Sequence, residues 1–104
     1  MEASSRAVHI SVTFKNTEAT DALKTYAEEK IGNVLRKFVH HDTESQVVLR
    51  VEKNRQIAEA SFRADGALFS GKESSDDLYA SIDLLVDSIT RQLRRHKEKL
   101  TKHH

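Results

Sequence analysis

The sequence predicts an α+β domain with the element order β-α-β-β-β-α, in which two helices pack on one face of a four-stranded sheet. Three features predict it: an alternating segment near the start, two long segments with apolar residues at helical spacing, and three short alternating segments between them. Because each strand has only one apolar face, both helices should cover the same side of the sheet. The other side should be polar and solvated, and should carry His9, Ser11, Thr13, Arg50, Glu52, Ser61, Arg63, Ser70 and Lys72.

The first strand is predicted for residues 8–14, where apolar and polar residues alternate strictly. Its apolar face consists of Val8, Ile10, Val12 and Phe14. A helix should follow, with Asn16, Thr17 and Thr20 as candidate N-caps. Its apolar residues at helical spacing are Leu23, Tyr26, Ala27, Ile31, Val34, Leu35 and Phe38. Gly32 weakens the middle of this helix without ending it.

Three short strands joined by short turns should form an antiparallel meander. Their apolar faces are Val47, Leu49 and Val51, then Ala58, Ala60, Phe62 and Ala64, then Phe69 in a strand over residues 67–72. The turn between the first two strands is predicted at residues 53–56. Asp65-Gly66 predicts a tight hairpin between the second and third, the strongest short turn signal in the chain.

The last helix is predicted to begin at residues 74–77, where Ser74 and Asp77 have the spacing of a capping box. Its apolar stripe consists of Leu78, Ile82, Leu85, Val86, Ile89, Leu93 and Leu100. The stripe implies a helix of about 27 residues and about 40 Å. His96 falls on the same stripe, so it should be a packed, hydrogen-bonded residue rather than a catalytic one.

Length and composition indicate one small domain over residues 8–104, preceded by a flexible segment over residues 1–7. The chain has 104 residues, a net charge of +1, and a balance of hydrophobic and charged residues that suits a folded domain. It has no cysteine, which excludes disulfides, thiolate zinc sites and cysteine nucleophiles. No apolar run approaches the ~20 residues that a membrane span needs. We therefore expect a cytoplasmic protein that has no membrane partner and is monomeric when free.

The last helix separates its charges along its length. Residues 73–87 have a net charge of −5, whereas residues 88–104 have a net charge of +5. The bases of the second half lie opposite the apolar stripe or beside that line, and they are Arg91, Arg94, Arg95, Lys97, Lys99 and Lys102. Matching of the helix dipole explains part of this pattern, but the dipole acts within the last turn and the bases span about three turns. Two interpretations stay open: a solvated face, or a phosphate-binding surface that Lys24, Lys30, Arg36, Lys37, Lys53 and Arg55 extend.

The sequence offers little for catalysis. It has no phosphate loop, no GxGxxG and no HExxH motif, so no enzyme activity, cofactor or metal is expected. Asp83 and Asp87 are more typical of a solvated acidic face than of a cation site. The adjacent histidines at residues 40–41 and 103–104 are poor metal sites. All four phenylalanines fall on apolar faces, so any RNA binding should use backbone contacts and shape rather than base stacking on the sheet.

Three segments resemble the hibernation-promoting factors of bacterial ribosomes. They are QVVLRVEK at residues 46–53, DLYASID at residues 77–83 and RQLRRHKEKL at residues 91–100. The resemblance extends from about Val8 to the end of the chain, and the last two segments are long and specific.

The resemblance implies a fold similar to double-stranded-RNA-binding domains and a ribosomal partner. Family members bind the small ribosomal subunit between its head and body, where messenger RNA and the transfer RNAs of the A and P sites otherwise lie. Translation then stops, and the ribosomes are protected during starvation or stationary phase. The basic residues of both helices face ribosomal RNA in the family. On this chain the resemblance points to Arg91, Arg94, Arg95, Lys97 and Lys99, and also to Lys24 and Lys30.

The resemblance is to the short form of the family. Neither the second domain of the long forms, which pairs ribosomes, nor the C-terminal tail of another short form, which opposes pairing, is expected here. The short form works with a separate small ribosome modulation factor to form inactive ribosome dimers. A non-enzymatic inhibitor of translation is therefore the leading hypothesis. The alternative, from the family's older label of sigma-factor modulation protein, is a protein-interaction module that contacts a transcription factor through Asp76 to Asp87.

Overall fold

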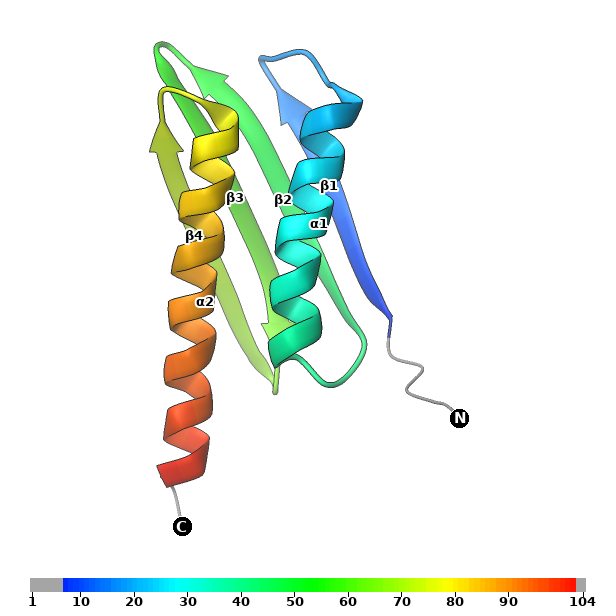
Figure 1. The fold of residues 1–104 in the computed structure, drawn as a ribbon, viewed down its shortest axis with the longest axis vertical. Coiled ribbons are helices and arrows are strands. Elements are labelled where there is room, and N and C mark those ends of the chain that lie inside the picture. Colours follow the sequence, from blue (N-terminus) through cyan, green and yellow to red (C-terminus); the bar gives the residue numbers. More distant parts are fainter. Residues whose placement is uncertain (1–6, 103–104) are drawn as a thin grey trace.

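The computed structural model describes residues 7–102, with side chains described through Leu100, and it has the predicted element order (Figure 1). The elements are β1 (Val8–Lys15), α1 (Asp21–Phe38), β2 (Thr43–Glu52), β3 (Arg55–Ala64), β4 (Ala67–Ser75) and α2 (Leu78–Lys102). The strands form one sheet in the order β1-β2-β3-β4, and both helices cover the same face of it. The predicted fold class is thus confirmed. The predicted flexible segment lies outside the described residues, apart from Ala7.

β1 pairs with β2 in parallel, from Val8 opposite Thr43 to Lys15 opposite Arg50. Parallel neighbours need a crossover connection, and α1 provides it. α1 begins after Thr20. The Thr20 hydroxyl accepts a hydrogen bond from the Leu23 backbone N–H at 3.1 Å. Thr20 is therefore the N-cap among the three candidates.

β2, β3 and β4 form the predicted antiparallel meander. Asp65 and Gly66 have φ angles of 53° and 78°, so the turn between β3 and β4 is of the type that needs positive φ at both central residues. The turn between β2 and β3 is shorter than predicted. It occupies residues 53–54, because Arg55 is already paired in the sheet.

The core lies between the sheet and the two helices. Its large, fully buried side chains include Ile31, Leu35, Val47, Leu49, Ile82, Leu85, Ile89 and Leu93. α1 packs on β1 and on α2, while α2 packs on β3 and β4. Gly71 in β4 allows α2 to approach closely, because a Cβ there would lie 3.0 Å from Leu85 Cδ1. Within residues 7–102, no helix has both the length and the apolar character needed to cross a membrane.

The predicted capping box at the start of the last helix is wrong. Ser74 lies in β4 opposite Ile57, and its hydroxyl accepts a hydrogen bond from Arg55 Nη2 at 3.0 Å. Asp77 caps α2 instead, since its carboxylate accepts a hydrogen bond from the Tyr79 backbone N–H at 3.2 Å. Strand pairing with β3 continues past the predicted end of β4, and this continuation moves the helix start to Leu78.

The prediction that Leu100 belongs to the buried stripe is also wrong. Leu93 is the last buried residue of α2 among the described side chains, whereas Leu100 is 53% exposed. Figure 1 gives the reason: α2 extends beyond the end of the sheet, so its final turns have no strands beneath them.

Candidate nucleic-acid interface

The second half of α2 presents a row of bases, and its final turns project past the sheet (Figure 1). We call Arg91, Arg94, Arg95, Lys97 and Lys99 the basic ridge; all are exposed except Lys97, which is half-buried. The side chain of the sixth predicted base, Lys102, lies outside the described part of the chain. Guanidinium groups match the oxygens of phosphate in a planar, two-pronged geometry, so three exposed arginines make this surface suitable for a polyanion.

One side of the basic ridge faces α1. The Tyr26 hydroxyl donates a hydrogen bond to Asp83 Oδ1 at 2.6 Å, which marks the sides by which the two helices face each other. Arg94 lies about three turns after Asp83 on that side of α2, and Lys30 lies about one turn after Tyr26 on that side of α1. The Lys30 ammonium is 5.4 Å from the centre of the Tyr26 ring. Lys30 thus lies on the side of α1 that faces α2, but about two helical turns before the level of Arg94 and close to the level of Asp87.

Lys24 lies on a different surface. It borders a shallow groove along β1, together with residues 9–12, Glu28 and Glu44. β1 is the sheet edge opposite β4, and α2 packs on β3 and β4. Lys24 is therefore separated from the basic ridge by α1, and the two do not form one continuous surface.

Both helices run in the same direction along the sheet, so their C-termini lie toward the same end of the molecule (Figure 1). α1 ends with Arg36 and Lys37 in its last turn. A helix C-terminus carries a partial negative charge of about half an elementary charge, which nearby cations compensate. Dipole matching accounts for these two residues and for the last bases of α2, but not for Arg91, which lies about three turns before the end of the helix.

The acidic half of α2 is partly engaged inside the molecule. Asp77 caps the helix, and Asp76 Oδ1 lies 3.7 Å from Arg55 Nη1. Asp83 accepts the Tyr26 hydrogen bond, and that bond, with desolvation and the charge of Asp83, raises the pKa of Tyr26 above its usual 10.0. Asp77 and Asp83 therefore have structural roles in this chain, whereas the Asp76 side chain is 96% exposed.

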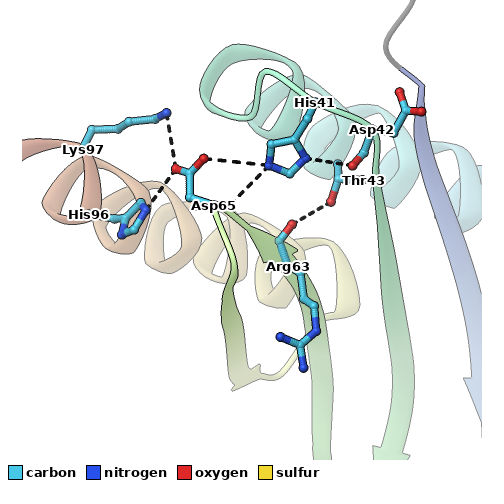
Figure 2. Close-up of polar contacts among 7 residues, drawn as sticks. All are labelled: His41, Asp42, Thr43, Arg63, Asp65, His96 and Lys97. Atoms are coloured by element: carbon cyan, nitrogen blue, oxygen red, sulfur yellow. Dashed lines mark hydrogen bonds and ion pairs between the residues drawn. The ribbon is translucent and has the colours of Figure 1, made fainter. Parts of the chain in front are cut away.

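Asp65 joins three segments near the end of the sheet from which α2 projects (Figure 2). Its Oδ2 atom lies 3.0 Å from His96 Nε2 and 3.7 Å from Lys97 Nζ. Its backbone N–H donates a hydrogen bond to His41 Nε2, in the connection between α1 and β2, at 3.2 Å. The other ring nitrogen, His41 Nδ1, lies 2.9 Å from the Asp42 carbonyl oxygen, so the ring contacts both the β3–β4 turn and its own connection.

His96 is the packed, hydrogen-bonded residue that the sequence predicts. Its ring packs edge-on against Phe69, with centroids 5.2 Å apart, and its side chain is 20% exposed. Desolvation alone would raise the pKa of Asp65, but the His96 hydrogen bond and the charges of Lys97, His96 and His41 together hold it below 3.8. The sequence identified Asp65 only as a turn residue, because no local pattern links it to a partner 31 positions later.

The sheet face without helices offers no aromatic platform among the described side chains. Phe62 and Phe69 are buried under the helices, with their rings stacked at 5.3 Å. Phe14 and Phe38 are partly buried against the same core. Nor do residues 7–100 hold a group of three or more histidines and carboxylates placed to bind a metal ion. The chemistry that this surface offers is contact between bases and phosphates.

The chain belongs to the family described as Sigma 54 modulation protein / S30EA ribosomal protein, whose model matches residues 10–101. Among its relatives is the ribosome hibernation promoting factor of Azotobacter vinelandii, which is 40% identical over 92 residues, or 88% of this chain and 85% of that protein. The ribosome hibernation promoting factor of Escherichia coli K12 is 32% identical over 96 residues, or 92% of this chain and all of that protein.

Two solved structures share this fold. The crystal structure of the N-terminal domain of Thermus thermophilus Protein Y matches with a TM-score of 0.75 and 30% identity, over 85% of this chain and 98% of that one. A ribosomal subunit interface protein from Coxiella burnetii matches with a TM-score of 0.77, over 86% of this chain and 98% of that one. Its identity is 24%, so this second likeness concerns the fold alone.

Proposed function

We propose that this chain binds the small ribosomal subunit in the channel for messenger RNA and transfer RNA, and reversibly blocks translation in stationary phase or stress. The binding unit is the single domain of residues 8–104, acting in the cytoplasm without a cofactor or catalysis. Family membership supports a ribosomal partner, as do the relatives named ribosome hibernation promoting factor.

The basic ridge is the observation that carries the proposal. Three exposed arginines lie within five residues of a helix whose final turns project past the sheet, and these turns are accessible to a large partner. The proposed contacts to ribosomal RNA are Arg91, Arg94, Arg95, Lys97, Lys99, Lys102, Lys24 and Lys30. Exposure favours the three arginines, whereas Lys30 lies about two helical turns before Arg94 and Lys24 would have to meet RNA on another side of α1.

The proposed mechanism is steric. Phosphate contacts hold a rigid domain in the channel, and the domain excludes messenger RNA and transfer RNA by occupying their space. Binding without a covalent step is reversible, and phosphate contacts make it sensitive to salt. The bound ribosomes stay inactive and, with a separate ribosome modulation factor, pair into dimers.

The alternative is a protein-interaction module that acts on a sigma factor, as one half of the family description suggests. Its contact surface would be the acidic half of α2. The contacts of Asp77 with the start of α2 and of Asp83 with Tyr26 weigh against that surface, since docking would compete with hydrogen bonds that stabilise the fold. Purification of the tagged protein from cells separates the two proposals: ribosomal RNA and subunit proteins should dominate for the first, a transcription factor for the second.

Co-sedimentation with isolated small subunits across a salt series tests the proposed function. We expect binding that weakens as salt rises and that messenger RNA and transfer RNA displace. The variant Arg91→Glu, Arg94→Glu, Arg95→Glu should fold but bind weakly. Full binding by this variant would refute the proposed anchor, and an absence of binding by the parent at low salt would refute the ribosomal partner.

A further inference from the structure

The final turns of α2 need support, because they extend beyond the sheet. Leu93 is the last buried residue of the helix among the described side chains, and Leu100 is 53% exposed. Isolated helical segments of this length are marginal in water, and helix ends fray. Most of the basic ridge lies in this region: Arg94 and Arg95 follow Leu93 directly, and Lys99 comes one turn later.

Beyond Leu93, the described contacts that attach α2 to the rest of the fold centre on the turn between β3 and β4. Asp65 accepts the hydrogen bond of His96 at 3.0 Å and lies 3.7 Å from the Lys97 ammonium. The His96 ring also packs against Phe69. Figure 2 shows His96 and Lys97 converging on the same carboxylate.

The turn that carries this carboxylate is itself held in place. The Asp65 N–H donates to His41 at 3.2 Å, and the Thr43 hydroxyl donates to the Arg63 carbonyl at 3.0 Å. The first bond ties the β3–β4 turn to the connection between α1 and β2, and the second ties the end of β3 to the first residue of β2 (Figure 2). Asp65 is therefore a fixed support for α2.

We propose that Asp65 is a positioning residue for the basic ridge: through His96 and Lys97 it keeps the projecting turns of α2 helical and correctly directed toward RNA. The inference rests on the proposed function for its RNA partner. Arg95 and His96 are neighbours, so a helix that frays from its C-terminus up to His96 loosens Arg95. Such fraying also disperses Lys97 and Lys99, whereas Leu93 still holds the turn before them. Each dispersed side chain then loses conformational freedom on binding, which weakens the complex.

The sign of the effect makes this proposal testable. Removal of a carboxylate beside a cationic surface strengthens binding to a polyanion on electrostatic grounds alone. Loss of the support that Asp65 gives to α2 should instead weaken that binding. Two variants remove the same negative charge but differ in their contact with His96. Asp65→Asn keeps a side-chain oxygen that accepts the His96 hydrogen bond, whereas Asp65→Gly has no side chain to accept it. Both Asn and Gly adopt the positive φ that this turn needs, so the hairpin stays intact in both.

The experiment compares the two variants in the full chain, after circular dichroism has shown that both are folded. Small-subunit binding should be about three- to tenfold weaker for Asp65→Gly than for Asp65→Asn, the range expected for the loss of one partly exposed hydrogen bond. Amide hydrogen exchange of residues 95–100 in the unbound protein should be faster by a similar factor. Equal affinities would overturn the proposal, and so would equal exchange rates.

A third variant leaves the turn untouched. His96→Phe keeps an aromatic ring against Phe69 and the Asp65 carboxylate but has no nitrogen to donate to Asp65, so it should bind more weakly and exchange faster than the parent. If it behaves like the parent, the proposal is wrong.

The exchange measurement also tests the role of Asp65 independently of the proposed function. If the parent fails to bind ribosomes at low salt, the proposed function fails, while faster exchange in Asp65→Gly would still establish that Asp65 orders the helix.

Discussion

The salt dependence of ribosome binding should fall by a definite amount when the arginines of the basic ridge are neutralised. Replacing Arg91, Arg94 and Arg95 with Gln removes three exposed positive charges from α2. If each arginine neutralises one phosphate, the slope of log K against log salt loses about 0.7 per contact, the value for single strands, to about 0.9, the value for B-form duplex DNA. The triple variant should therefore lower the slope by about 2–3 units.

Co-sedimentation with small subunits at several salt concentrations measures this slope. A matched control replaces Lys15, Arg63 and Lys72 with Gln, because these three bases are exposed on the sheet face that no helix covers. Both variants have the same net charge. The control should keep nearly the whole parental slope, since its bases lie on the face away from the helices.

Two results would refute the reasoning. An unchanged slope in the ridge variant would mean that the arginines do not contact phosphates. Equal losses in the ridge variant and in the control would mean that binding responds to net charge and not to the placement of charge on α2. In either case the proposed steric block of the channel would need other residues to hold the domain on the ribosome.

Three further predictions concern the fold. Gly71→Val should lower the free energy of unfolding by about 1–3 kcal/mol, because even a Cβ there would lie 3.0 Å from Leu85 Cδ1. An unchanged midpoint of urea unfolding would contradict this close packing. Because the folded-state pKa of Asp65 lies below 3.8, its contribution to stability is present above that pH and is lost as the pH falls through the folded value. The stability difference between the parent and Asp65→Asn should accordingly shrink in acid, and thermal unfolding that finds a constant difference would argue against it. Asp83→Ala should lower the pKa of Tyr26 toward 10.0, and an ultraviolet titration that finds no change would exclude the hydrogen bond as its cause.

Local periodicity was enough to predict the elements and their faces. The alternation in residues 8–14 and the stripe from Leu78 to Leu93 identify a strand and a helix because each pattern repeats within a few residues. Asp65-Gly66 identifies its hairpin for the same reason, since the conformation that the turn needs is a property of those two residues. The end of β4 was missed because it depends on pairing with β3 and not on an apolar pattern of its own.

The candidate site was only partly predictable. The separation of charge along α2 is visible in the sequence, so the ridge arginines were identified without a structure. The sequence could not distinguish Lys24 from Lys30, because their relation to α2 depends on how the two helices pack. The role of Asp65 was hidden as well, since its contacts with His96 and His41 join segments that only the folded sheet brings together.

The charge separation along α2 also decides how the molecule meets a polyanion in solution. From Asp83 to Arg95 the helix rises by about 18 Å, more than twice the screening length of about 8 Å at physiological ionic strength. An approaching nucleic acid therefore senses one end of the protein at a time, and the near-zero net charge says little about the force it experiences. The field turns the domain so that the arginine end arrives first, before any specific contact forms. The acidic end repels the nucleic acid, so the encounter favours one orientation of the domain even though the chain as a whole is almost neutral.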